Sequence, residues 1–158
     1  MVPSDEQPPR WLSPAELEDW LAVVALTMRL PTALDSQLTR DSGLSHLEYS
    51  VLAMLSEDKG HARRLSELAM LTNSSLSRLS HLISRVEERG LVRREADPDD
   101  GRYTKAILTD EGYELLKSSA PGHVERVRTA VLDAVTPEEF RQFGRTAARI
   151  VKRLEDLG

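Results

Sequence analysis

The fold of this chain is indicated most clearly by residues 75–108, SLSRLSHLISRVEERGLVRREADPDDGRYTKAIL. The first half of this stretch has apolar residues at helical spacing, which predicts a helix with one face against a core and an end at Gly90. These apolar residues are Leu76, Leu79, Leu82, Ile83 and Val86. The opposite face combines short hydrogen-bonding groups with cations, namely Ser77, Arg78, Ser80, His81, Ser84 and Arg85. No acidic residue lies on this face before Glu87, so the face is polar and basic.

The second half of the stretch predicts a β-hairpin. Residues 91–95 and 103–108 are short extended runs, and an aspartate-rich loop of five to seven residues joins them. A calcium-binding EF-hand loop has glycine at its sixth position and glutamate at its twelfth. Counted from Asp97, Gly101 is fifth and Leu108 is twelfth. We therefore interpret the loop as a turn, in which Gly101 supplies a backbone conformation closed to most residues.

On both sides of this stretch, capping boxes predict the starts of three further helices, at Ser13–Glu16, Ser45–Glu48 and Thr136–Glu139. Pro31 is expected to kink or interrupt the first of them. A short helix from Ser66 to Leu71 precedes the polar-faced helix, for which Ser75 is the expected cap. Thr109 is expected to cap a long helix that bends at Pro121-Gly122.

The order of these elements predicts a fold class, mainly α with a small β-hairpin wing. It is a winged helix-turn-helix flanked by long N- and C-terminal helices. Arg63 and Arg64, ahead of the short helix, can form a small third strand and touch phosphate, or can be ordinary surface charges.

Composition narrows the function. The 158 residues suit one structural unit, and the net charge of −5 argues mildly against a nucleic-acid partner. The charges are unevenly placed, however, because residues 61–94 carry seven Lys or Arg against three Asp or Glu. A basic segment thus lies inside an acidic frame. The absence of cysteine excludes disulfides, thiolate metal sites and thiol-based redox sensing.

Other classes of protein find little support. No apolar run approaches the roughly 20 residues that span a bilayer, so we expect no membrane contact. Residues 1–10 are acidic and proline-rich, which predicts a disordered tail rather than a signal peptide and favours a cytoplasmic location. The four histidines lack the i, i+4 or HExxH spacing of helical zinc sites, and no catalytic motif is present. We expect no enzyme activity, no catalytic residues, no cofactor and no metal.

The sequence resembles the MarR family of transcriptional regulators. The resemblance rests on LSELAM at residues 65–70, on SRLSHLISRVEERGLVRREADPDDGR at 77–102 and on LTDEG at 108–112. It implies a homodimer that binds double-stranded DNA at a palindromic site, most often as a repressor. Residues 11–44 and 110–158 would then form the helical dimerisation region, and residues 45–109 the winged helix-turn-helix DNA-binding region.

The resemblance also implies which residues meet DNA. The wing motif Asp-Pro-x-Asp-x-Arg is matched by residues 97–102, and in the family its arginine, here Arg102, enters the minor groove. Asp100 can hold Arg102 in a fixed pose by a charge-assisted hydrogen bond. On the polar-faced helix, Arg78 is expected to contact guanine through O6 and N7, and Arg85 the DNA backbone. The full set of DNA-binding candidates is Ser75, Ser77, Arg78, Ser80, His81, Arg85, Arg94, Asp100 and Arg102.

An effector is expected by the same resemblance: a small, often aromatic anion bound between the dimerisation helices and the DNA-binding region. Candidates to line such a pocket bring aromatic or soft groups to the first two helices: Trp20, Met28, His46 and Tyr49. The alternative is that these four are core or dimer-interface residues. An alternative function is a ligand-binding or protein-interaction module that has kept the fold and no longer binds an operator.

Overall fold

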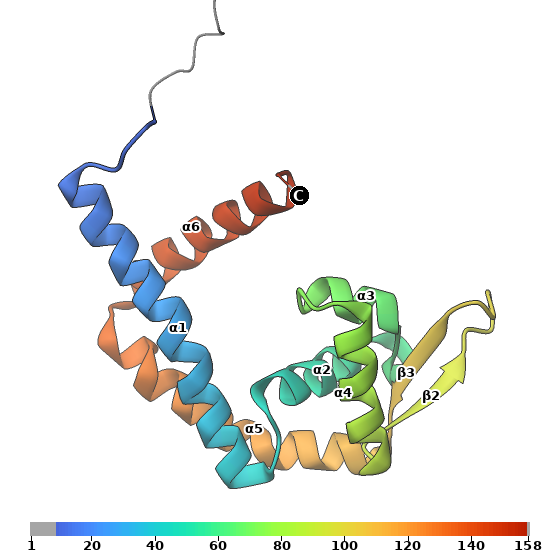
Figure 1. Cartoon of the computed structure of the whole chain (residues 1–158). Coiled ribbons are helices and arrows are strands. Elements are labelled where there is room, and N and C mark those ends of the chain that lie inside the picture. Colours follow the sequence, from blue (N-terminus) through green and yellow to red (C-terminus); the bar gives the residue numbers. More distant parts are fainter. Residues whose placement is uncertain (1–8, 158) are drawn as a thin grey trace, which may run out of the picture.

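Within residues 9–157, which the computed structural model describes, the chain forms six α-helices and one antiparallel sheet of three short strands (Figure 1). The helices are α1 (Pro14–Ser42), α2 (His46–Glu57), α3 (Leu65–Leu71), α4 (Leu76–Glu88), α5 (Asp110–Ala130) and α6 (Pro137–Glu155). The strands are β1 (Ala62–Arg64), β2 (Val92–Ala96) and β3 (Thr104–Leu108), and two 3-10 turns, η1 (Lys59–His61) and η2 (Leu132–Ala134), complete the chain. This order confirms the predicted fold class. Residues 1–8 of the predicted tail lie outside the described residues.

The predicted capping boxes are all present. In α1, the Ser13 hydroxyl accepts from the Glu16 backbone N–H at 3.3 Å, and the Glu16 carboxylate accepts from the Ser13 N–H at 2.8 Å. The same reciprocal pair starts α2 at Ser45 and α6 at Thr136. Each pair satisfies two N–H groups that a helix start would otherwise leave without partners. The starts of these helices are therefore local properties of the sequence.

Pro31 does not interrupt α1, which continues as one helix to Ser42. A proline inside a helix costs about 3 kcal/mol, because it removes a hydrogen bond and crowds the preceding turn. The half of α1 after Pro31 buries Leu34 and Leu38 and packs against α5, and this tertiary contact outweighs the local cost. The expected interruption is therefore wrong. Likewise α5 runs through Pro121 as one helix and changes direction on its way from the sheet to α1 (Figure 1).

The sheet has the strand order β1-β3-β2 and is antiparallel throughout. The predicted third strand is present, with Arg64 opposite Lys105. We call β2, β3 and the loop 97–103 between them the wing. Gly101 is not among the glycines with a positive φ, so its expected conformational role is wrong. The turn is closed by Asp100 instead, whose carbonyl accepts from the Tyr103 N–H at 3.0 Å and whose carboxylate accepts from the Arg102 N–H at 3.2 Å.

The core lies between α2, α3, α4 and the sheet. On α4, four of the five predicted core residues are buried: Leu79, Leu82, Ile83 and Val86. The fifth, Leu76, is 54% exposed, so its assignment to the core is wrong. A helical side chain covers the turn that precedes its own Cα. For Leu76, the first residue of α4, that turn is the polar segment 72–75 rather than a core element.

Gly112 brings α5 against the wing. A Cβ at this position would lie 2.0 Å from the Leu91 carbonyl oxygen, so only glycine fits. Thr109, the N-cap of α5, donates its hydroxyl to the Gly90 carbonyl at 2.6 Å and accepts from the Gly112 N–H at 3.0 Å. The start of α5 is thereby fixed to Gly90 and Leu91, the segment between α4 and β2.

The helices separate into two parts that meet at an angle (Figure 1). We call α2, α3, α4 and the sheet the lobe, and α1, the C-terminal half of α5 and α6 the arm. Within the arm, α6 points away from α1 and α5 and extends over the open side of the angle (Figure 1). None of its residues is buried in the described protomer.

Candidate nucleic-acid interface

The outward face of α4 carries the predicted polar residues. Ser77, Arg78, His81 and Arg85 are exposed, and Ser80 is half-buried. Ser75 caps the helix as predicted, because its hydroxyl oxygen accepts from the Arg78 N–H at 3.2 Å. Since the other face of α4 is buried in the core, these side chains are presented from a fixed helix.

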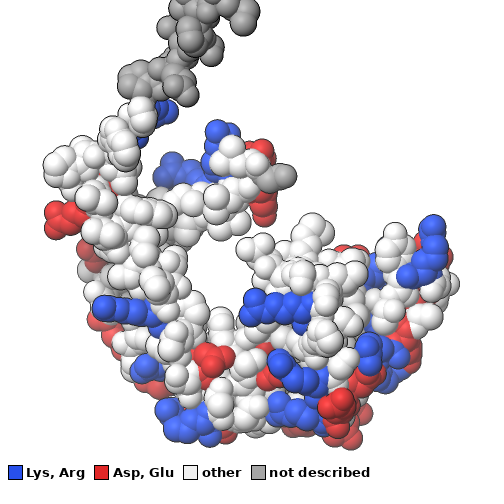
Figure 2. Space-filling model, in the orientation of Figure 1, with Lys and Arg blue, Asp and Glu red and all other residues white. Residues whose placement is uncertain are grey.

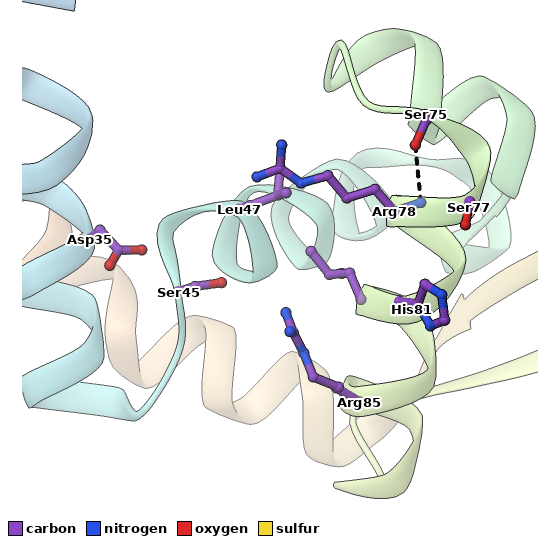
Figure 3. A pocket seen from close by; sticks show the side chains of 9 residues that line it. Asp35, Ser45, Leu47, Ser75, Ser77, Arg78, His81 and Arg85 are labelled. Atoms are coloured by element: carbon purple, nitrogen blue, oxygen red, sulfur yellow. Dashed lines mark hydrogen bonds between the residues drawn. The ribbon is translucent and has the colours of Figure 1, made fainter. Parts of the chain in front are cut away.

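An open cleft of about 570 Å³ runs beside α4, on the side that faces α1 (Figure 3). Arg78 and Arg85 extend from α4 into this cleft, and Asp35 of α1 lies across it (Figure 3). Its lining combines α2 and α4 of the lobe, with their caps, and α1 of the arm: Asp35, Ser45, Leu47, Ser75, Ser77, Arg78, His81, Leu82 and Arg85. The cleft therefore joins the predicted DNA-binding face to the boundary between arm and lobe.

Arg85 also has a partner within the protomer that the sequence did not indicate. Its Nη2 lies 3.4 Å from Oε1 of Glu48, a side chain that is only 9% exposed. Arg89 approaches the other carboxylate oxygen at 3.8 Å and donates to the Gly43 carbonyl at 3.0 Å. In the sequence, Glu48 is recognisable only as part of a capping box. It also holds the C-terminal half of α4 to the connection between α1 and α2.

At the tip of the wing, Arg102 is 84% exposed along its side chain. Its Nε and Nη2 donate to the two carboxylate oxygens of Asp100 at 2.9 and 2.6 Å. These bonds from Arg102 lower the pKa of Asp100 and fix the guanidinium plane. The predicted hydrogen bond is therefore present, and a cation stands at the tip of the wing, where Figure 2 shows Lys and Arg on the surface.

Below the tip, Asp97 is 2% exposed and forms an ionic cluster that the sequence analysis missed. Its carboxylate accepts from the Asp99 N–H at 3.0 Å, pairs with Arg64 of β1 and lies 3.2 Å from Nζ of Lys105 on β3. The Asp99 N–H, followed by the side chains of Arg64 and Lys105, lowers the pKa of Asp97 to about 2. The Arg64 guanidinium also lies over the Tyr103 ring, 4.6 Å from its centroid. The signal in the sequence was the predicted third strand, which places Arg64 opposite Lys105 on β3.

Arg94 is directed toward α4 rather than toward the wing tip. Its Nη2 lies 2.6 Å from Oε2 of Glu87, and its backbone N–H donates to Oε1 of the same residue at 2.8 Å. Its neighbour Arg93 pairs with Glu95. Arg63, the other basic residue considered for phosphate contact, pairs with Asp58. These cations have partners within the protomer, whereas Arg78 extends into the open cleft (Figure 3).

The four effector candidates do not line one common pocket in the part of the chain that the structure describes. Trp20 and Met28 are exposed on α1. His46 and Tyr49 lie on α2 beside His123 of α5, with ring centroids 5.9 and 4.4 Å from the His123 ring. His46 lines a small pocket at the boundary between arm and lobe together with Pro31, Thr32, Asp35 and Leu47.

No group of three or more His, Asp or Glu side chains within residues 9–157 is arranged to hold a metal ion. Among the same residues, no helix combines the length and apolar character needed to cross a membrane.

Comparisons with known proteins agree with this geometry. A model of the MarR family matches residues 42–102. The transcriptional repressor YetL of Bacillus subtilis is 29% identical over 112 residues, which cover 71% of this chain and 66% of YetL. The transcriptional regulator YxaD of the same organism is 30% identical over 129 residues, covering 82% of this chain and 88% of YxaD.

Two solved structures from Streptomyces coelicolor are similar over nearly the whole chain. Sco3205, a MarR family transcriptional regulator crystallised in complex with DNA, is 42% identical with a TM-score of 0.89, and the match covers 94% of this chain and 93% of Sco3205. AbsC, a MarR family transcriptional regulator, is 36% identical with a TM-score of 0.88, and the match covers 94% of this chain and 99% of AbsC.

Proposed function

The chain belongs to the MarR family of DNA-binding transcriptional regulators, and from this premise we propose that it binds a palindromic operator as a homodimer and represses transcription. The observation that carries the proposal is the surface shared by α4 and the wing. On it, Arg78 and His81 are exposed on a helix whose other face is buried, and Arg102 is exposed at a tip that Asp100 orders.

The residues divide by what each can contact. Arg78 extends an exposed guanidinium from the first turns of α4, which suits bidentate contact with guanine in the major groove. Ser75, Ser77, Ser80 and His81 supply shorter donors and acceptors for phosphates or base edges beside the N-terminus of α4. Arg102, with its plane set by Asp100, suits insertion into a narrow minor groove.

Arg85 and Arg94 take supporting roles in this proposal. Each is paired with a glutamate of the lobe, so each can offer only its remaining N–H groups to a phosphate. Phosphate contacts fix orientation and do not select sequence. Loss of either arginine is therefore expected to weaken binding to all sequences alike.

The homodimer is supported by apolar surface on the arm. The helices α1 and α6 carry large apolar side chains that a folded monomer would expose to water, among them Leu17, Trp20, Leu21, Met28, Phe143, Ile150, Val151 and Leu154. Figure 2 shows that the faces of α1 and α6 bordering the hollow carry few charges. Contiguous apolar surface of this kind marks an interaction site. A second copy of the chain, related by a twofold axis, would cover the apolar faces of α1 and α6 with its own α1 and α6.

Release by a small effector is the remaining part of the proposal. The cleft beside α4 and the pocket at His46 both lie between the arm and the lobe. A small anion held there by Arg78 or Arg85 would favour one angle between arm and lobe over another, and would compete with DNA for the same arginines. Trp20 and Met28 are better assigned to the dimer interface, because both are exposed on the arm.

Selection of bound fragments from genomic DNA, followed by gel-shift titration at several salt concentrations, tests the proposal. A palindromic sequence bound at least about 1,000-fold more tightly than random DNA is expected for a specific regulator. Equal affinity for selected and random DNA would instead favour a module that has kept the fold without operator binding. Transcription from the selected promoter, with and without the protein, then distinguishes repression from activation.

A further inference from the structure

Leu76 is exposed at a position where burial was expected. The other apolar residues of α4 are at most 3% exposed, whereas Leu76 at the start of the helix is 54% exposed. An isolated exposed leucine needs no explanation on an ordinary surface. Here it lies on the first turn of the helix proposed to enter the major groove, where the residues that contact base edges are found.

The surroundings of Leu76 connect α4 to the wing. A hollow of about 230 Å³ lies between them, and Leu76 lines it together with Ser80, Arg102 and Tyr103. Leu76 and Ser80 are four residues apart and so share one side of α4. Arg78 lies on another side and lines the cleft toward the arm. The first turns of α4 therefore offer a cation on the arm side and an apolar group on the wing side.

The major groove contains one prominent apolar group, the 5-methyl of thymine, and apolar side chains recognise thymine through it. We propose that Leu76 is a specificity-determining residue that contacts the methyl group of a thymine in each half-site, on the wing side of the base pair that Arg78 contacts. This inference rests on the proposed function, because it requires α4 in the major groove. It adds a base preference that the polar residues of α4 do not supply.

Deoxyuridine tests the contact, because it lacks only the methyl group and keeps the hydrogen-bonding groups of thymine. Each thymine of the selected operator is replaced in turn, in both half-sites, and the affinity of the full-length wild-type protein is measured. Removing one buried methyl group corresponds to about a fourfold loss of affinity per half-site. We expect such a loss at one thymine position of each half-site.

Leu76→Ala identifies the side chain responsible. The Leu76→Ala protein is expected to bind the thymine operator and the deoxyuridine operator with equal affinity. That affinity should be about the affinity of the wild-type protein for the deoxyuridine operator. Met70→Ala, which truncates an exposed side chain of α3, is the matched control and should keep the wild-type ratio. Arg78→Ala should also keep the ratio while weakening both complexes. Thermal unfolding of each variant checks that it is folded.

The outcomes separate this inference from the proposed function. If the protein selects an operator but no deoxyuridine replacement lowers affinity, or if the half-sites contain no thymine, the contact by Leu76 is wrong and operator binding stands. A Leu76→Ala protein that remains as sensitive as wild type to the methyl group also overturns it. If no operator is selected at all, the proposed function fails first.

Discussion

Arg102 is held by hydrogen bonds to Asp100, whereas Arg78 extends into the open cleft. We therefore expect their substitutions to have different effects on DNA affinity and base preference. Within residues 9–157, no hydrogen bond or ion pair holds the Arg78 guanidinium, which is exposed and extends into the cleft beside α4 (Figure 3). Arg78→Ala is expected to cost about 1 to 3 kcal/mol at one base pair of each half-site and to relax the preference there. Arg102→Ala should weaken binding to most sequences while leaving the preferred bases unchanged. Gel-shift titration against the operator and its single-base variants measures both, and equal losses on every sequence for the two proteins would refute this division.

Asp97 is a second residue with a specific role, in stability rather than in contact with DNA. Asp97→Asn would leave Arg64 and Lys105 without their shared carboxylate, so we expect a loss of about 1 to 3 kcal/mol in the free energy of unfolding at pH 7. The pKa of Asp97 is lowered to about 2, so its contribution is complete above the ordinary value of 3.8 and is lost as the pH falls from there toward 2. Urea unfolding from pH 7 to pH 2 should show the two proteins converging in acid. The exposed Asp99 is the control, since Asp99→Asn should change the free energy of unfolding by less than about 0.5 kcal/mol. If wild type and Asp97→Asn differ in unfolding free energy by the same amount at all pH values, the loss is not caused by the charge of Asp97.

Between elements, the contact of α5 with the wing depends on the absence of one Cβ. Gly112→Ala would place that atom 2.0 Å from the Leu91 carbonyl oxygen, which belongs to the backbone and cannot move alone. We expect a loss of about 3 kcal/mol or more in the free energy of unfolding, because overpacking against backbone forces α5 and the wing apart. Gly101→Ala is the matched control, since its Cβ would meet nothing within 4 Å and its φ is not positive. Thermal or urea unfolding that shows equal effects for the two would mean that α5 can shift at little cost.

Where α2 meets α5, two histidines make stability depend on pH. Burial lowers the pKa of both His46 and His123, and the Nδ1 of His123 has no hydrogen-bond partner in the described protomer. The other side chains facing the pair are Tyr49 of α2 and Asp35 of α1. Because the unfolded chain binds protons first, stability is full above about pH 6.5 and falls as the pH drops through that value toward the lowered folded pKa. His123→Asn should flatten the slope of the unfolding free energy between pH 7 and 5.5, as measured by urea unfolding. An unaltered slope would show that other groups dominate.

Local signals explain which elements were predictable. Serine or threonine followed three residues later by glutamate fixes a helix start through groups a few ångströms apart, so α1, α2 and α6 begin where the pattern predicts. The path of α1 through Pro31 depends instead on packing against α5, more than 70 residues away, which no local pattern contains. The Asp97 cluster is hidden for the same reason, since it joins β1 to the end of β2 only once the sheet has formed. Leu76 was assigned to the core because periodicity alone cannot show where a helix extends past the element it packs on.

In the whole molecule, the polar face of α4 and Arg102 at the wing tip are exposed as expected, because both belong to one short, continuous stretch of sequence. Their contact with DNA stays a prediction. The arrangement of the effector candidates could not be predicted in this way, because Trp20 lies on the arm and His46 lies on the lobe. This separation depends on the packing of α1 against α5, which no local sequence pattern contains. In the proposed function, Trp20 and Met28 belong to the dimer interface, whereas His46 lines the pocket between arm and lobe. The arm then has one principal task in the proposed function, to hold two lobes at the spacing of the operator.

Dimerisation through α6 can be tested directly. Light scattering of the wild-type protein at micromolar concentration should give twice the chain mass of 17.7 kDa. Ile150 is 54% exposed on α6 and lies within its apolar face, so Ile150→Asp should place a charge in the proposed interface and yield monomers. Because each lobe would then bind its half-site alone, operator affinity should fall further than in Arg78→Ala or Arg102→Ala. Met70→Asp, on the lobe, places the same charge on an exposed apolar position and should remain dimeric. A monomeric wild type, or an Ile150→Asp protein that keeps both its mass and its operator affinity, would show that α6 covers some other partner.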